Sequence, residues 1–181
     1  MGIDRLLKAI HDQAPVTGLT HDYYRYPARF SPSFVRAAIE AFTEHGDVVL
    51  DPFMGGGTTV VEAKATSRSS VGVDISELAV FVARVKTAIL SETELGQVGD
   101  WARMAAENVS PRRPLCIHRD ASTERYLRNF PWRIREMTDQ ALKLAKDLPP
   151  RAHRLARCAL LRTAQWAVDG KKGEIATASE F

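Results

Sequence analysis

The feature that most constrains the fold is the segment 48–60, where a short apolar run leads through three glycines into helix-forming residues. Val48-Val49-Leu50 is wholly apolar and predicts a buried β-strand. The run Gly55-Gly56-Gly57 lets the backbone approach a ligand without side-chain hindrance. A helix expected from Thr58 would direct its N-terminal amides at that ligand. The segment therefore predicts a binding site at the carboxyl end of a strand.

The residues that follow extend this pattern. Ser70-Val71-Gly72-Val73 predicts a second short strand, which ends at Asp74. Apolar residues then recur at three- and four-residue steps from Leu78 to Ile89, which indicates an amphipathic helix. Residues 47–90 thus alternate strand, glycine loop, helix, strand and helix. This alternation is typical of a parallel α/β sheet with crossover helices.

The rest of the chain predicts mostly helices. We expect them at 3–10, from Ser31-Pro32 onward, and at about 95–109, 133–148 and 151–169, with one short strand at 115–118. We divide the chain into an N-terminal helix and linker (1–20), an α/β region (21–110) and a basic helical region (111–181). Residues 111–173 carry 15 Lys and Arg against 6 Asp and Glu. This excess indicates a polyanion partner, with ordinary solvated helix faces as the alternative.

Composition excludes several classes of protein. Hydrophobic residues make up 45% and charged residues 26% of the 181 residues, as in soluble globular proteins. No apolar run reaches the roughly 18 residues of a membrane helix, and no apolar signal core follows the N-terminus. Cys116 and Cys158 are interpreted as reduced thiols rather than a disulfide or a metal pair. We therefore expect a cytoplasmic protein with no bound metal.

The glycine loop departs from two familiar phosphate-binding patterns. A Walker loop needs Gly-Lys-Ser/Thr, and no lysine follows Gly57, which argues against an NTPase. A dinucleotide fingerprint needs a third glycine three residues further on, where this chain has Val60. The glycines alone could serve only chain geometry. The acid, proline and aromatic that precede them favour a binding loop.

These residues carry a resemblance to a known family. The string Asp51-Pro52-Phe53-Met54-Gly55-Gly56-Gly57-Thr58-Thr59 resembles the S-adenosylmethionine (SAM) motif D-P-F-x-G-x-G-T-T of amino-methylating DNA methyltransferases. Those enzymes modify the exocyclic amine of adenine (N6) or cytosine (N4). The resemblance implies a Rossmann-like class I SAM-dependent methyltransferase core, α/β, incomplete, with an added C-terminal helical region. It also implies that the cofactor SAM contacts Asp51, Pro52, Phe53, Gly55, Gly57, Thr58 and Thr59.

Two further segments agree with the resemblance. The family has an acid at the end of the second strand, and a carboxylate at Asp74 can accept both ribose hydroxyl protons. The alternative is that Asp74 caps the next helix. The aromatic segment 24–30 is similar to the family's segment that closes over the methionine end of SAM, which adds Tyr26 and Pro27 to the predicted cofactor residues. Its alternative role is to fill the core with aromatic rings.

The family's catalytic tetrapeptide, (Asp/Asn/Ser)-Pro-Pro-(Tyr/Phe/Trp), does not occur in the sequence. The nearest string, Asn129-Phe130-Pro131-Trp132, has Phe in place of the first proline and is interpreted as a loop before a helix. Residues 177–181 have the spacing that opens a helix. We therefore expect a fragment, or one half of a split enzyme, that is inactive by itself and whose catalytic residues are unknown. A second polypeptide would then carry the catalytic motif.

Taken together, the sequence predicts the SAM-binding portion of a site-specific DNA methyltransferase of the restriction–modification kind. DNA is the expected partner of the basic region, with six arginines as candidate phosphate contacts: Arg112, Arg113, Arg119, Arg128, Arg133 and Arg135. Two alternatives stay open. One is a non-catalytic module that binds SAM or DNA, and the other is an RNA or small-molecule methyltransferase.

Overall fold

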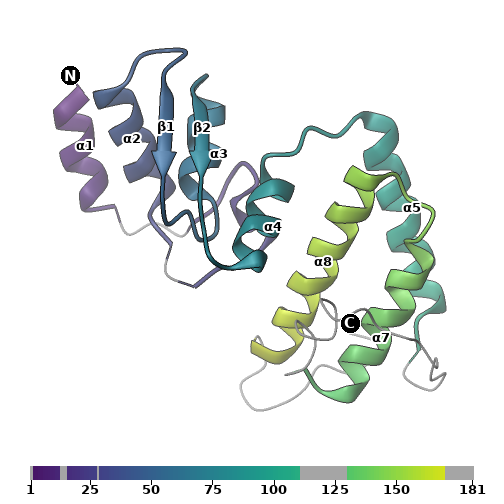
Figure 1. Ribbon diagram of the computed structural model, residues 1–181. Helices are drawn as coiled ribbons and strands as arrows, with labels where there is room; N and C mark the ends of the chain where they lie inside the picture. Colours follow the sequence, from purple (N-terminus) through teal and green to yellow (C-terminus); the bar gives the residue numbers. More distant parts are fainter. Residues whose placement is uncertain (1, 13–15, 28, 111–129, 170–181) are drawn as a thin grey trace. The chain divides into compact units, whose positions relative to one another are not determined.

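The computed structural model describes residues 2–12, 16–27, 29–110 and 130–169 (Figure 1). The chain divides into two compact units, 1–89 and 90–181. The part boundaries expected at residues 20 and 110 stay predictions. The strand expected at 115–118, the string that begins at Asn129, Cys116 and the residues after 169 fall wholly or partly outside the described residues.

The first unit combines helices with a small parallel sheet. Its elements are α1 (Gly2–Ile10), the 3-10 turn η1 (His21–Tyr23), α2 (Pro32–Phe42), β1 (Val48–Asp51), α3 (Thr58–Ala65), β2 (Ser69–Gly72) and α4 (Glu77–Lys86). The two strands pair in parallel, from Val48 opposite Ser69 to Asp51 opposite Gly72. The predicted alternation of strands and helices is confirmed. The structure is a mixed helical fold with a small parallel sheet, consistent with an α/β methyltransferase.

Local sequence explains where these elements begin and end. Pro32 stands in the first turn of α2, where its missing N–H costs nothing. The Ser76 hydroxyl accepts a hydrogen bond from the Ala79 amide, 3.4 Å away, and caps α4. The helix ends at Lys86, three residues before the predicted end. Beyond it the Ala88 amide donates to the Val85 carbonyl, three residues back, at 3.2 Å, and the Thr87 hydroxyl donates to the Ala83 carbonyl at 2.8 Å.

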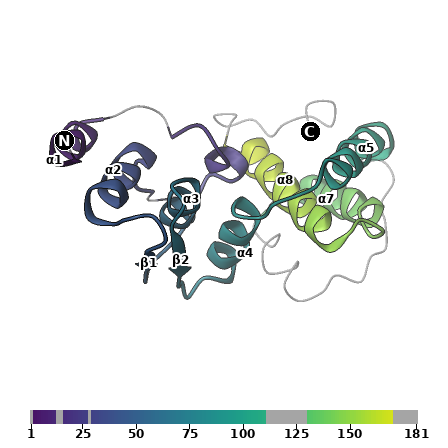
Figure 2. The ribbon, with the colours of Figure 1, turned by 90° about the horizontal axis from the view of Figure 1, so that it is seen from above.

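The sheet is covered by α2 and α3 on one side (Figure 2). The core on that side contains Val35, Ile39 and Ala63, with Val49 packed against it. The neighbouring side chains of β1 point the other way, because alternate residues of a strand face opposite sides. Val48 is 66% exposed and Leu50 is 64% exposed. The prediction that this strand is buried is therefore wrong for these two residues.

The described residues of the second unit form three helices: α5 (Glu92–Asn108), α7 (Trp132–Leu144) and α8 (Pro150–Asp169). Ser91 and Glu94 form a capping box at the start of α5. Small side chains such as Ala141 and Ala156 let the helices pack closely around Trp101, whose Nε1 donates to the Ala141 carbonyl at 2.9 Å. The helices predicted in this part of the chain are confirmed, with ends shifted by a few residues.

Cys158 is buried in the second unit. The interpretation of both cysteines as reduced thiols stays a prediction, because Cys116 lies outside the described residues. In the ranges that the structure describes, no helix is long and apolar enough to span a membrane.

Candidate cofactor-binding site

The loop 52–57 lies at the carboxyl ends of both strands. Asp51 ends β1 opposite Gly72 of β2. Backbone hydrogen bonds continue the pairing beyond the strands, from the Val73 amide to the Asp51 carbonyl (2.9 Å) and from the Met54 amide to the Val73 carbonyl (3.0 Å). The start of the glycine loop is therefore fixed to the sheet, at the edge where parallel α/β folds bind ligands.

The Asp74 carboxylate joins the glycine loop to the start of α4. One oxygen accepts from the Gly55 amide at 2.9 Å and the other from the Ser76 amide at 2.8 Å. Ser76, rather than Asp74, is the N-cap residue of α4. Each carboxylate oxygen retains a further lone pair for another donor. The predicted contact between Asp74 and a ribose is compatible with this geometry and stays a prediction.

Asp51 orients the turn that follows β1. Its carboxylate accepts from the Phe53 amide at 3.1 Å, which makes a short side-chain-to-backbone turn. Pro52 is exposed, and the Phe53 ring is 88% exposed. Ile75, directly after Asp74, is fully exposed as well. Two uncovered apolar side chains thus follow the carboxylates at the ends of the two strands.

The glycines are required by the backbone and by their neighbours. Gly55 and Gly57 have φ angles of +48° and +78°, in the left-handed region that favours glycine. A Cβ on Gly57 would lie 3.2 Å from the Cα of Ala83, and a Cβ on Gly56 would lie 2.7 Å from the Cβ of Tyr26. The loop therefore packs closely against α4 on one side and against Tyr26 on the other.

The remaining predicted cofactor residues lie around this loop. Thr58 and Thr59 are the first residues of α3; Thr58 is buried and Thr59 half-buried. Tyr26 is half-buried, and its ring edge lies 3.5 Å from where a Gly55 Cβ would be. Pro27 follows Tyr26 in the chain and is exposed. The structure thus brings the aromatic segment into direct contact with the glycine loop through Tyr26.

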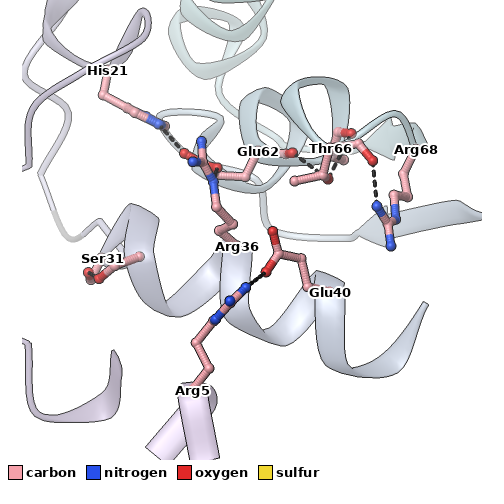
Figure 3. Close-up of polar contacts among 10 residues, drawn as sticks. Arg5, His21, Ser31, Arg36, Glu40, Glu62, Thr66 and Arg68 are labelled. Atoms are coloured by element: carbon pink, nitrogen blue, oxygen red, sulfur yellow. Dashed lines mark hydrogen bonds and ion pairs between the residues drawn. The ribbon is translucent and has the colours of Figure 1, made fainter. Parts of the chain in front are cut away.

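Two adjacent residues anchor the chain shortly before the aromatic segment. The Thr20 hydroxyl donates to the Lys86 carbonyl at 2.8 Å. The imidazole Nε2 of His21 lies 2.8 Å from a carboxylate oxygen of Glu62 (Figure 3). These contacts attach the residues that lead into the aromatic segment to the end of α4 and to α3, the two helices next to the glycine loop.

Glu62 is the centre of a buried polar cluster. Its second carboxylate oxygen accepts from Nε of Arg36 on α2 at 2.7 Å (Figure 3). Burial by itself raises the pKa of Glu62, but hydrogen bonds from His21 and Arg36 and the charge of Arg36 more than offset it. The net pKa of this carboxyl lies below its ordinary value of 4.5. The side chain is 2% exposed and is held as a carboxylate.

Sequence reasoning missed several of these residues. Glu62 and Lys86 are charged residues on predicted helices, where such residues ordinarily face water. His21 lies in a turn-rich stretch that has no periodicity. For Ile75 the sequence holds one weak signal. It is an apolar residue directly after the strand-ending Asp74, and it does not belong to the apolar pattern of the following helix.

The predicted DNA contacts belong to the second unit. Arg133 is exposed near the start of α7, with its guanidinium carbon 5.5 Å from the centroid of the Trp132 ring. Arg135 is half-buried. The other four candidates, Arg112, Arg113, Arg119 and Arg128, lie outside the described residues. Across the described parts of both units, no group of three His, Cys, Asp or Glu side chains could hold a metal ion.

An acid at the end of a strand, a glycine loop with positive φ angles and a second carboxylate on a loop amide form an arrangement of the kind in which α/β folds bind nucleotide-type ligands. Comparison with known proteins specifies the class. The family described as DNA methylase, acting on N6 and N4 positions, matches residues 7–84. This match contains the glycine loop, Asp74 and the aromatic segment. Residues 7–84 of this chain are similar to the DNA methylase family, which supports the resemblance that the motif indicated.

Curated relatives agree. The chain is 36% identical over 66 residues to the Type II methyltransferase M.MjaII of Methanocaldococcus jannaschii, which covers 36% of this chain and 12% of the relative. It is 41% identical over 69 residues to the Type II methyltransferase M.BsoBI of Geobacillus stearothermophilus, an alignment that covers 38% of this chain and 14% of the relative. It is 32% identical over 106 residues to M.MvaI of Kocuria varians, covering 52% and 23%. The matched part thus spans less than a quarter of each relative. No solved structure matches the chain.

Proposed function

We propose that this chain is the SAM-binding portion of a site-specific DNA methyltransferase that modifies the exocyclic amine of adenine (N6) or cytosine (N4). The observation that carries the proposal is the loop Asp51–Gly57, held on the Asp74 carboxylate through the Gly55 amide. The family match over this segment and the names of the Type II relatives support it.

The donors and acceptors at the loop fit the functional groups of SAM. The amides at the start of α3 suit the carboxylate of the methionine end. Asp51 and Asp74 suit the groups of SAM that donate hydrogen bonds, which are the ammonium and the ribose hydroxyls. The exposed side chains of Phe53 and Ile75 suit the apolar face of an adenine ring. SAM would supply an electrophilic methyl group on its sulfonium.

Calorimetric titration of SAM into the full chain tests the cofactor assignment. We expect saturable binding, weakened about 10- to 100-fold by Asp51→Ala, because a charge-assisted hydrogen bond contributes roughly 1.5–3 kcal/mol. Asp47→Ala is the matched control, because Asp47 precedes the opposite end of β1 and its carboxylate accepts a hydrogen bond from the Glu44 amide at 2.9 Å. Its affinity for SAM should stay within about twofold. A folded chain that takes up no SAM would refute the assignment.

Methyl transfer to an amine also requires residues that hold the flipped base. The sequence contains no (Asp/Asn/Ser)-Pro-Pro-(Tyr/Phe/Trp) string to do so. In this proposal the motif lies outside residues 1–181, on the same polypeptide or on a second one, and residues 1–181 contribute the cofactor site and part of the DNA contact.

The DNA contact is assigned to the basic residues 111–173, of which Arg133 is exposed in the structure. Arg133→Glu is expected to weaken binding of duplex DNA and to reduce the slope of log K against log salt by about 1 for each lost phosphate contact. Arg103→Glu is the control with the same charge change; Arg103 lies on α5 and pairs with Asp100. Equal affinities of the two variants at each salt concentration would contradict the assignment.

A further inference from the structure

We propose that Lys86 is a positioning residue of the SAM site, which holds the glycine loop and the aromatic segment in one arrangement. The inference rests on the proposed function and concerns the same site. Lys86 is the last residue of α4, yet its side chain is turned inward and the residue is only 3% exposed. Its Nζ donates to the Gly56 carbonyl at 2.8 Å in a buried hydrogen bond.

The burial of this ammonium is costly and therefore informative. A lysine in the last turn of a helix ordinarily extends into water, where its charge is fully solvated. Removing that charge from water is unfavourable unless hydrogen bonds replace the lost hydration. The Gly56 carbonyl is one such acceptor. The fold thus pairs the buried ammonium of Lys86 with a backbone carbonyl of the proposed cofactor loop.

The carbonyl of Gly56 belongs to the peptide group that sets the loop's shape. Peptide groups are planar, so fixing one side fixes the other. The amide on the other side, that of Gly57, donates to the Met54 carbonyl at 2.8 Å. Glycines can rotate such a peptide group through conformations closed to other residues. Lys86 and the Met54 carbonyl together hold this group from both sides, just before the first amides of α3.

Lys86 also contacts the chain shortly before the aromatic segment. Its backbone carbonyl accepts the hydrogen bond from the Thr20 hydroxyl at 2.8 Å. Six residues further on, Tyr26 packs so closely on Gly56 that a Cβ there would lie 2.7 Å from the Tyr26 Cβ. The side chain of Lys86 therefore holds the glycine loop, and its backbone carbonyl holds the residues that lead into the aromatic segment.

A positioning role and a purely structural role predict different results. If Lys86 has only a structural role in the interior, its replacement lowers the free energy of unfolding. SAM affinity then stays unchanged at temperatures where the variant is folded. If Lys86 positions the loop, SAM affinity falls in the folded variant as well, because the loop amides no longer start in the binding arrangement.

The experiment compares Lys86→Met with Lys64→Met in the full chain. Lys64 provides a matched control, because its Nζ donates to the carbonyl of the neighbouring residue Thr87 at 2.5 Å in an exposed position. SAM dissociation constants are measured by calorimetry about 15 °C below the midpoint of thermal unfolding of each variant. We expect a loss of about tenfold for Lys86→Met. For Lys64→Met we expect less than a twofold change.

A second variant covers the case in which Lys86→Met does not fold. Thr20→Val removes only the hydroxyl that reaches the Lys86 carbonyl, and we expect SAM to bind several-fold more weakly. When Thr20→Val and Lys86→Met are combined, their losses of SAM affinity should not add, because both residues hold the same arrangement of the glycine loop and the aromatic segment. Unchanged affinity in Thr20→Val and in any folded Lys86→Met chain overturns the positioning role alone. Absence of SAM binding by the unaltered chain overturns it together with the proposed function.

Discussion

Replacing Gly57 by valine is expected to abolish SAM binding and to destabilise the first unit by about 3 kcal/mol or more. The φ angle of +78° is strained for any residue with a Cβ and most of all for a β-branched one. The added Cβ would also lie 3.0 Å from the Cβ and 3.2 Å from the Cα of Ala83. A backbone atom cannot move aside as a side chain does, so the start of α3 would have to move away from α4.

Gly46→Val distinguishes the effect of the strained φ angle from the effect of the contact with Ala83. Gly46 has a φ of +93°, so valine is strained there as well, but nothing lies within 4 Å of its added Cβ. It precedes β1, at the end of the strand opposite to the glycine loop. We expect Gly46→Val to lose about 1–2 kcal/mol of unfolding free energy and to bind SAM as the unaltered chain does. Urea unfolding and calorimetry on both variants measure the two quantities. Equal losses at the two positions would show that packing against Ala83 contributes nothing.

Much of this site could be predicted from the sequence, because its signals are local. The apolar run before Asp51, the three glycines and the helical period from Leu78 each fix the backbone of their own segment. The order of these segments then places the carboxyl ends of both strands at one edge. The structure confirms the strands and helices on this basis, and it places Asp51, Asp74 and the glycines together at that edge.

What could not be predicted depends on contacts between distant segments. A helical pattern shows which residues are polar, but not that Lys86 turns inward to reach Gly56, 30 residues earlier in the chain. In the same way Glu62 meets His21, 41 residues away, only after α3 and the turn-rich segment have packed together. The exposure of Val48 and Leu50 is a further example, because an apolar strand does not reveal which of its faces is covered.

The second large effect is expected at Glu62, where an exchange to alanine should lower the unfolding free energy by about 3–5 kcal/mol. Alanine would leave His21 and Arg36 without the carboxylate that each contacts, at 2.8 Å and 2.7 Å. His21 is 1% exposed, and its Nδ1 has no hydrogen-bond partner among the described residues. Loss of the Nε2 contact would therefore leave a buried imidazole without that hydrogen bond as well. Glu40→Ala is the control, since Glu40 pairs at 2.7 Å with the exposed Arg5 and should lose about 1 kcal/mol or less (Figure 3).

The loss at Glu62 should also depend on pH in a defined direction. The pKa of this carboxyl in the folded chain lies below its ordinary value of 4.5, because the hydrogen bonds from His21 and Arg36 outweigh the effect of burial. The unfolded chain therefore binds a proton at Glu62 more readily than the folded chain does. The stability that the carboxylate contributes is complete above pH 4.5 and is lost as the pH falls through the folded pKa.

The difference in unfolding free energy between the unaltered chain and Glu62→Ala should consequently shrink between pH 7 and pH 3, measured by urea unfolding. A difference that stays constant or grows on acidification would show that the ionised carboxylate is not what holds the cluster together. Glu40→Ala should show a much smaller change over the same range, because its ion pair is exposed to water and screened by salt.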